Sequence, residues 1–248
     1  MKEYNDHIVS SFDDDIASIR RSIIKMATLV EEQYKLLHHI VDTGSASTVE
    51  DVLDNEPKLD AFDGKIRDQV ITFITLRSPM AIDLREGLAA LKISTDLERL
   101  GDYCKNISLR IQALEDIPPA EIKNEILRMI VMVQGQLKKV IDAYVSKNKD
   151  KAVEVRNADA LIDKHYTVTY NHIIEDIRNK PNKIKTLMDT KLLFTIKTIE
   201  RAGDHITNIA EEVYYAIVGE TLSTPRPKLS LIHISEPTRL LSIGYARM

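Results

Sequence analysis

The segment DLERLGDYCKNI, residues 96–107, returns later in the chain as TIERAGDHITNI, residues 198–209. Its centre, Glu98-Arg-Leu-Gly-Asp102, corresponds to Glu200-Arg-Ala-Gly-Asp204 at an offset of 102 residues (200 − 98). Asn106-Ile107 and Asn208-Ile209 keep the same offset. A five-residue pattern that recurs in this way indicates an internal repeat. The chain is therefore expected to contain two copies of one structural unit.

The segments around these motifs have the periodicity of long helices. Apolar residues recur at spacings of three and four, which is typical of amphipathic helices. The pattern predicts three helices in each half: residues 12–41, 47–77 and 81–114 in the first, and residues 120–145, 149–179 and 184–217 in the second. In the helix over residues 81–114, the apolar face is expected to include Leu84, Leu88 and Leu91.

The stop signals of the two halves also correspond. Arg77-Ser-Pro79 in the first half takes the place that Asn179-Lys-Pro-Asn182 takes in the second, and Ile117-Pro-Pro119 marks the boundary between them. Aromatic residues are few and no alternating β-rich runs occur, so we predict an all-α protein of two tandem, pseudo-symmetric, antiparallel three-helix bundles. The predicted divisions are residues 1–117, residues 118–222 and a tail over residues 223–248.

The end of the chain breaks the helical pattern. The segment LSLIHISEPTR, residues 229–239, matches at every position a translation of the adapter used in transposase-based DNA library preparation. We therefore expect residues 229–248 to be a sequencing artefact and exclude them from fold reasoning. The alternative is a real, loosely ordered tail.

Composition narrows the classes of function. The formal charge of −4, from 34 basic and 38 acidic residues, offers no excess of positive charge for nucleic acid. Cys104 is the single cysteine, so no intramolecular disulfide can form, and a free thiol suits a reducing compartment such as the cytoplasm. The N-terminus lacks the basic start and apolar run of a signal peptide, and no apolar stretch is long enough to insert into a membrane.

Each repeat places carboxylates on one helix face. Glu98 and Asp102 are four residues apart, as are Glu200 and Asp204, and residues at this spacing project from the same face of a helix. A second pair lies on the preceding helix of each half, Glu56 with Asp60 and Asp159 with Asp163. In an antiparallel hairpin, the separations of 42 residues (98 − 56) and 41 residues (200 − 159) would bring the two pairs to one level.

Four carboxylates at one level need compensation. Like charges raise each other's pKa and cost free energy unless cations, protons or basic side chains lie nearby. Hard cations and iron accept clustered carboxylate oxygens, so a metal site is one interpretation. A basic partner surface and a solvated stripe on a plain helical scaffold are the others.

Four further residues qualify this pattern. Gly101 and its counterpart Gly203 each cost about 1 kcal/mol relative to alanine inside a helix, which suggests close helix packing or access to a site. Pro57 directly follows Glu56, so a helix can start or kink there and turn Glu56 away. His205 stands where the first repeat has Tyr103; it can join a site or lie on the surface, and we expect the surface.

With these motifs the sequence resembles the PhoU family, whose two repeats each carry an acidic motif of this form. The resemblance rests on residues 96–102, on residues 199–204 and on the segment RSPMAIDLR at residues 77–85, and it covers about residues 5–220. It implies two three-helix bundles, a cytoplasmic homodimer and a regulatory role without catalysis.

The resemblance also implies partners and ligands. Members of this family couple a phosphate ABC transporter, through its ATPase subunit, to a phosphate-sensing histidine kinase, and hold the phosphate-starvation response off when phosphate is plentiful. Some members bind iron or zinc clusters on their acidic motifs. The candidate metal ligands carried over are Glu56, Asp60, Glu98, Asp102, Asp159, Asp163, Glu200 and Asp204.

An enzyme is a further alternative. A di-iron carboxylate oxidase can be built in a helix bundle, but such sites use Glu-x-x-His steps, and the acidic repeats contain none. No nucleophile with a neighbouring base and no Gly-rich phosphate loop is visible. We therefore expect no catalytic residues.

Overall fold

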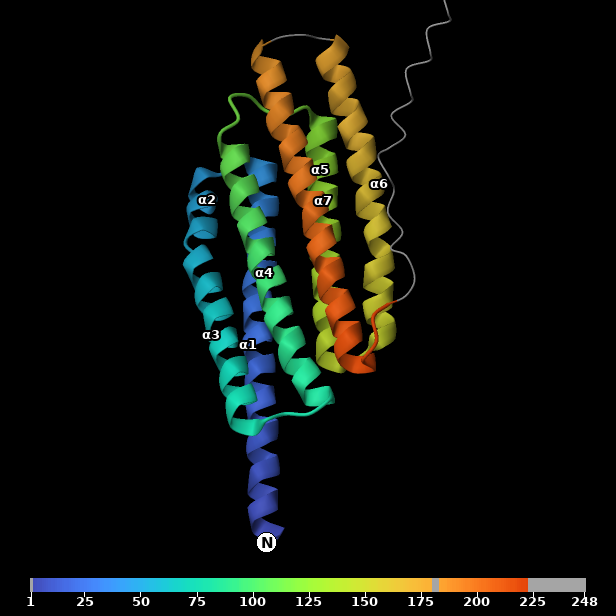
Figure 1. The fold of residues 1–248 in the computed structure, drawn as a ribbon. Helices are drawn as coiled ribbons and strands as arrows, with labels where there is room; N and C mark the ends of the chain where they lie inside the picture. The colour runs from blue at the N-terminus through green and yellow to red at the C-terminus, as the bar shows by residue number, and fades with distance from the viewer. Residues whose placement is uncertain (1, 180–182, 223–248) are drawn as a thin grey trace, which may run out of the picture.

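The computed structural model describes residues 2–179 and 183–222, and every element in these residues is a helix. The first half contains α1 (Lys2–Thr43), α2 (Ala46–Leu53), α3 (Glu56–Arg77) and α4 (Ile82–Gln112). The second half contains α5 (Ala120–Ser146), α6 (Lys149–Asn179) and α7 (Lys183–Val218). The helices run nearly parallel to one long axis (Figure 1). The all-α prediction is confirmed, whereas the predicted adapter artefact at residues 229–248 lies outside the described residues.

The second predicted helix of the first half is broken into α2 and α3. Leu53 ends α2, Asn55 precedes α3, and Pro57 lies in the first turn of α3. Proline has no backbone N–H, and its ring would clash with the carbonyl of the residue four positions earlier, so a helix that continued from α2 through Pro57 would be kinked or broken there. The prediction of a single helix over residues 47–77 was therefore wrong at residues 54 and 55.

The connection from α3 to α4 is tight. Ser78 ends α3 in the left-handed conformation, with φ of 47°, and its N–H donates to the Ile74 carbonyl oxygen. Pro79 follows, and Ala81 precedes α4, also at φ of 47°. Because proline restricts the residue before it, the predicted stop at Arg77-Ser-Pro79 has a direct physical cause.

The two bundles pack against each other along their length. In the first bundle α1, α3 and α4 pack together, and in the second α5, α6 and α7 do so. The bundles meet where α4 packs on α7 and α1 packs on α5. In Figure 1, α4 and α7 lie side by side between α3 and α6. The two helices that carry the repeated motif are therefore in contact with each other.

The helix α4 is buried on more sides than its sequence pattern predicts, because α1, α3 and α7 all pack on it. Ala89, Ala90, Ile93 and Leu97 form its buried face. The prediction that Leu88 lies on the apolar face was wrong, since this side chain is 44% exposed. No helix among the described residues has the length and apolar character needed to cross a bilayer.

Candidate functional site

Each bundle carries one set of four carboxylates on its last two helices. We call Glu56, Asp60, Glu98 and Asp102, on α3 and α4, the first acidic motif. We call Asp159, Asp163, Glu200 and Asp204, on α6 and α7, the second acidic motif.

In the first acidic motif, the structure brings carboxylates of α3 and α4 within electrostatic reach of one another. Partial burial raises the pKa of Glu98, and the nearby charge of Asp102 raises it further. The charge of Arg99 acts in the opposite direction, and those of Asp60 and Asp63 raise the pKa of Glu98 again. Three neighbouring carboxylates thus act on Glu98 in the same direction, as expected for carboxylates that face one another across a helix pair.

Basic side chains lie among these carboxylates. The Lys105 ammonium contacts the Glu56 carboxylate and lies 3.4 Å from Asp102 Oδ1. The Arg99 guanidinium lies 3.6 Å from Glu98 and 3.5 Å from Asp102. Glu56, at the start of α3, therefore reaches Lys105 of α4. The first acidic motif thus contains its own cations.

The second acidic motif lies deeper in its bundle. Asp159 is 2% exposed and Asp163 is 6% exposed, whereas Asp60, the counterpart of Asp163, is exposed. Lys197 lies 2.6 Å from Glu200. Its ammonium also lies 5.2 Å from the centre of the Tyr166 ring, a cation–π contact. The two motifs are therefore alike in sequence but differ in burial and in the source of positive charge.

The repeated glycines permit close approach of the helices. A Cβ on Gly101 would lie 2.2 Å from Leu59 Cδ1, and a Cβ on Gly203 would lie 2.5 Å from Asp159 Oδ1 and 3.1 Å from Ile162 Cδ1. Real Cβ atoms do not approach heavy atoms below 3.0 Å. The interpretation of close packing at both glycines is therefore confirmed.

The metal-ligand role of the eight carboxylates remains a prediction. Among the side chains that the structure describes, no three His, Cys, Asp or Glu residues are grouped as a ready metal-binding set. A divalent cation would need either movement of the carboxylates or water among its ligands, which hard cations accept.

A hydrogen-bonded chain crosses the bundle interface beside the two motifs. The Tyr103 hydroxyl lies 2.9 Å from His205 Nε2, and His205 Nδ1 lies 2.7 Å from Asp96 Oδ1. Tyr103 and His205 occupy equivalent positions in the two repeats, directly after Asp102 and Asp204. The expectation that His205 lies on the surface was wrong, because it is part of the contact between α4 and α7.

Residues from both bundles also meet near the start of α4. The buried Glu86 carboxylate contacts the Arg20 guanidinium of α1 and lies 2.9 Å from Lys147 Nζ, directly after α5. Burial acts to raise the pKa of Glu86, but hydrogen bonds and charges from Lys147 and Arg20 outweigh it, so the pKa lies below its ordinary value. This cluster links the first bundle to the second.

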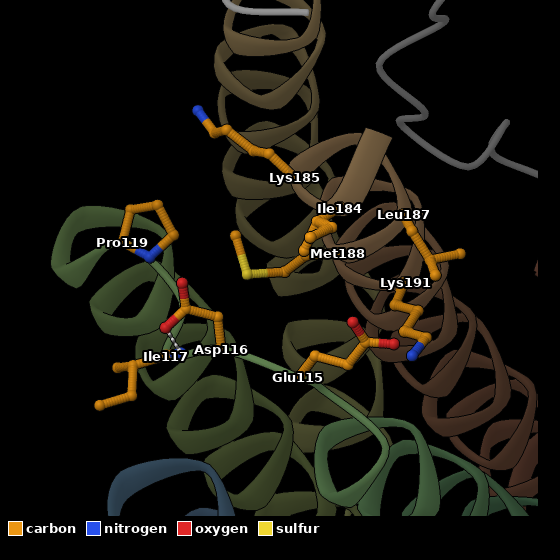
Figure 2. A pocket seen from close by; sticks show the side chains of 9 residues that line it. All are labelled: Glu115, Asp116, Ile117, Pro119, Ile184, Lys185, Leu187, Met188 and Lys191. Carbon is orange, nitrogen blue, oxygen red and sulfur yellow. Dashed lines mark hydrogen bonds between the residues drawn. The ribbon is translucent and has the colours of Figure 1, made fainter. Parts of the chain in front are cut away.

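A pocket of about 500 Å³ lies between the inter-repeat linker and the start of α7 (Figure 2). Apolar side chains such as Ile117 and Met188 line it together with Glu115, Lys185 and Lys191. Ile117 is 81% exposed. No residue of either acidic motif lines this pocket. It is therefore separate from the site that the repeat indicates.

Sequence reasoning missed several residues of the site. Lys105 could have been found, because it lies three residues after Asp102 and therefore on the same side of that helix. The second repeat has Thr207 at the corresponding position. Lys197 lies three residues before Glu200 and gave a similar signal. The link from Asp96 to His205 had no such signal, because it depends on how the two bundles pack.

Fold and site together define a class: tandem helical bundles, in contact through their motif-bearing helices, with one acidic motif in each bundle. The family model described as the PhoU domain matches residues 23–111 and again residues 126–213. This chain belongs to the PhoU family.

Individual relatives agree with this assignment. The phosphate-specific transport system accessory protein PhoU homolog of Caulobacter vibrioides is 35% identical over 228 residues, which cover 92% of this chain and 98% of the relative. The homolog of the same description from Xylella fastidiosa (strain Temecula1) is 35% identical over 230 residues, with 91% and 92% covered. The crystal structure of PhoU from Pseudomonas aeruginosa has the same fold, with a TM-score of 0.79 at 23% identity over 84% of this chain and 100% of that one.

Proposed function

We propose that this chain is an accessory protein of a phosphate-specific transport system and holds the phosphate-starvation response off when phosphate is plentiful. The observation that carries the proposal is the match to relatives described as phosphate-specific transport system accessory proteins over nearly their whole length. In this proposal the chain acts in the cytoplasm as a homodimer, and it docks on the ATPase subunit of a phosphate ABC transporter and on a phosphate-sensing histidine kinase.

The proposal assigns no reaction to the chain. The position three residues after Glu98 is Gly101, and the position three residues after Glu200 is Gly203. A di-iron oxidase would need histidines at these positions. Here a side chain would collide with the neighbouring helix, so an adaptor role is favoured over a di-iron enzyme.

The proposal includes binding of iron or zinc by the acidic motifs. The second motif offers carboxylate oxygens from α6 and α7, which are donors that hard cations and iron accept. A metal bound there would supply positive charge between α6 and α7.

The regulatory role can be tested with a starvation-response reporter in a bacterial strain that lacks its own copy of this gene. The wild-type chain is expected to restore repression in high phosphate. The quadruple variant Glu98→Ala/Asp102→Ala/Glu200→Ala/Asp204→Ala is expected to lose repression while remaining folded. Full repression by a stable quadruple variant would remove these residues from the mechanism.

A matched control separates the motifs from total charge. The variant Glu50→Ala/Asp51→Ala/Asp150→Ala/Glu154→Ala removes two Glu and two Asp at exposed positions outside both motifs. It is expected to repress like the wild type.

A further inference from the structure

We infer that α7, where it lies beside the end of α4, is a docking surface for an amphipathic helix of a partner protein that carries acidic residues beside its apolar ones. The inference rests on the proposed adaptor role, to which it adds a docking place and the chemistry of the docked segment. We call the residues that form this surface on α7 the α7 stripe; they are Leu187, Lys191, Phe194 and Thr198.

The α7 stripe has the spacing of a coiled-coil seam. Its residues follow one another at intervals of four, three and four, as the core positions of successive heptads do. Its two apolar side chains are nevertheless open to solvent, Leu187 being 49% exposed and Phe194 61% exposed. Because burial of apolar surface is favourable, a second helix packed along this seam would be stabilised by both side chains.

A pocket extends the apolar surface at one end of the α7 stripe. Leu187 lines the pocket of about 500 Å³ at the inter-repeat linker, together with Ile117, Pro119 and Met188 (Figure 2). Ile117 comes from the linker and is 81% exposed. The surface therefore combines apolar groups of α7 and of the linker, and an aliphatic side chain of a docked helix can enter the pocket.

Two basic side chains beside Phe194 indicate the charge of the partner. The Arg110 guanidinium of α4 lies 5.9 Å from the centre of the Phe194 ring and donates to the Thr198 hydroxyl at 3.3 Å. Burial lowers the pKa of Arg110, which reflects the cost of an uncompensated charge. Lys191 donates to the Ala113 carbonyl oxygen, and within the described part of the chain neither basic group forms an ion pair. An acidic residue of the partner would supply the compensating charge.

The linker end of the surface has a mixed charge, which disfavours other classes of partner. Glu115 and Asp116 line the pocket there, and Lys185 beside them is paired with Asp176 at 2.7 Å. These carboxylates would repel the phosphates of nucleic acid or of an anionic membrane. A helix can instead place an apolar residue at the pocket and its acidic residues near the two basic groups.

Two labelled peptides of about three heptads serve as probes. Both have leucine at the core positions of each heptad. One has glutamate and the other lysine at the flanking positions, so each peptide is repelled by its own copies. Fluorescence anisotropy measures their binding to the purified full-length chain at low salt. We expect the wild type to bind the glutamate peptide about tenfold more tightly than the lysine peptide.

Removal of the apolar groups is expected to give the largest loss. Leu187→Ser/Phe194→Ser should weaken binding of the glutamate peptide by about 30-fold, and Phe194→Ser alone by about tenfold. Leu161→Ser/Val168→Ser is the matched control, because these side chains of α6 are 55% and 59% exposed and are also seven residues apart (168 − 161 and 194 − 187). The control should bind like the wild type.

Reversal of the two charges tests the acidic character of the partner. Arg110→Glu/Lys191→Glu should bind the lysine peptide more tightly than the glutamate peptide. Lys138→Glu/Lys164→Glu, at exposed lysines of α5 and α6, makes the same change of charge elsewhere and should keep the wild-type preference.

The inference is overturned if Leu187→Ser/Phe194→Ser binds the glutamate peptide as the wild type does, or if the wild type does not prefer that peptide. It is also overturned if this variant loses self-association in sedimentation, or binding to phosphatidylglycerol vesicles, without weaker peptide binding. Those results would assign the α7 stripe to a second copy of the chain or to a membrane. Failure of the proposed function has a different signature, because the wild type then restores no repression in the reporter strain while the peptide titrations still decide the inference.

Discussion

The two repeats place the same acidic pattern on equivalent helices but compensate it in different ways. In the first, Lys105 and Arg99 lie among partly exposed carboxylates. In the second, Asp159 and Asp163 are buried and Lys197 contacts Glu200 from the preceding turn. Both repeats therefore share the helix register and the close packing at Gly101 and Gly203. They differ in the burial of their carboxylates and in the basic residues that lie beside them.

The interface between the repeats shows the same divergence. A symmetric pair of copies would place one residue type against itself, but here Tyr103 meets His205. Asp96, whose counterpart is Thr198, accepts a hydrogen bond from His205 when Nδ1 carries a proton. The two halves have become complementary where they touch.

The largest expected effect tests what the repeats share. Gly101→Val and Gly203→Val each place a side chain into an occupied space, so each is expected to lower the free energy of unfolding by about 3 kcal/mol. Gly64→Val and Gly135→Val are the controls, because a Cβ at those helical glycines meets no atom within 4 Å. Urea unfolding measures all four. A loss in one motif glycine alone would show that close packing is not shared.

A smaller effect is expected at the charged cluster that joins the bundles. Glu86→Gln removes the carboxylate that binds Arg20 and Lys147, and the expected loss at pH 7 is about 1.5 kcal/mol. Because the pKa of folded Glu86 lies below its ordinary 4.5, this stabilisation is present above pH 4.5 and is lost as pH falls through the folded value. Unfolding at a series of pH values from 7 downward should therefore show a constant difference between wild type and variant above pH 4.5 and a shrinking difference below it. A difference that does not depend on pH would contradict the ion-pair account.

The hydrogen-bonded link across the bundle interface comes next. Tyr103→Phe removes the hydroxyl that lies 2.9 Å from His205, and a loss of about 1 kcal/mol is expected. Tyr215→Phe, at another partly buried tyrosine, controls for loss of a hydroxyl as such. Thermal unfolding would compare them, and equal melting temperatures for Tyr103→Phe and the wild type would remove the link from the account.

The smallest effects are expected to have opposite signs in the two motifs. The pKa of Glu98 is raised, so the folded chain holds that proton more tightly than the unfolded chain, and stability falls as pH rises from 4.5 through the folded value. Glu98→Gln should therefore stabilise the chain at pH 7 by less than about 1 kcal/mol, and the gain should vanish below pH 4.5. Glu200→Gln loses the contact with Lys197 and should destabilise by a similar small amount. Denaturant unfolding of both variants at pH 7 would show whether the signs differ.

Much of the fold was predictable because it depends on local sequence. The helix over residues 149–179 was predicted with the bounds of α6, and the predicted helix at 120–145 differs from α5 by one residue. The range 47–77 did not include the break at Asp54 and Asn55, although Pro57 had indicated that a helix can start or kink there, as α3 does. The exposure of Leu88 could not be predicted from periodicity, because which faces of α4 become covered depends on how α1, α3 and α7 pack on it.

The candidate site was predictable in part for the same reason. Spacing along a helix placed Glu98 with Asp102 and Glu200 with Asp204. The burial of Asp159 and the path from Asp96 through His205 to Tyr103 depend on packing between helices and between bundles, which one sequence does not reveal. Lys105 lay within the repeated segment, but its role became clear only once Glu56 was placed beside it.

The most direct test of the proposed metal role of the acidic motifs is anomalous diffraction from crystals of the full chain grown with Zn²⁺. The account predicts an anomalous peak beside the carboxylates of at least one acidic motif. Crystals of the Zn²⁺-treated chain with no peak at either motif would contradict it.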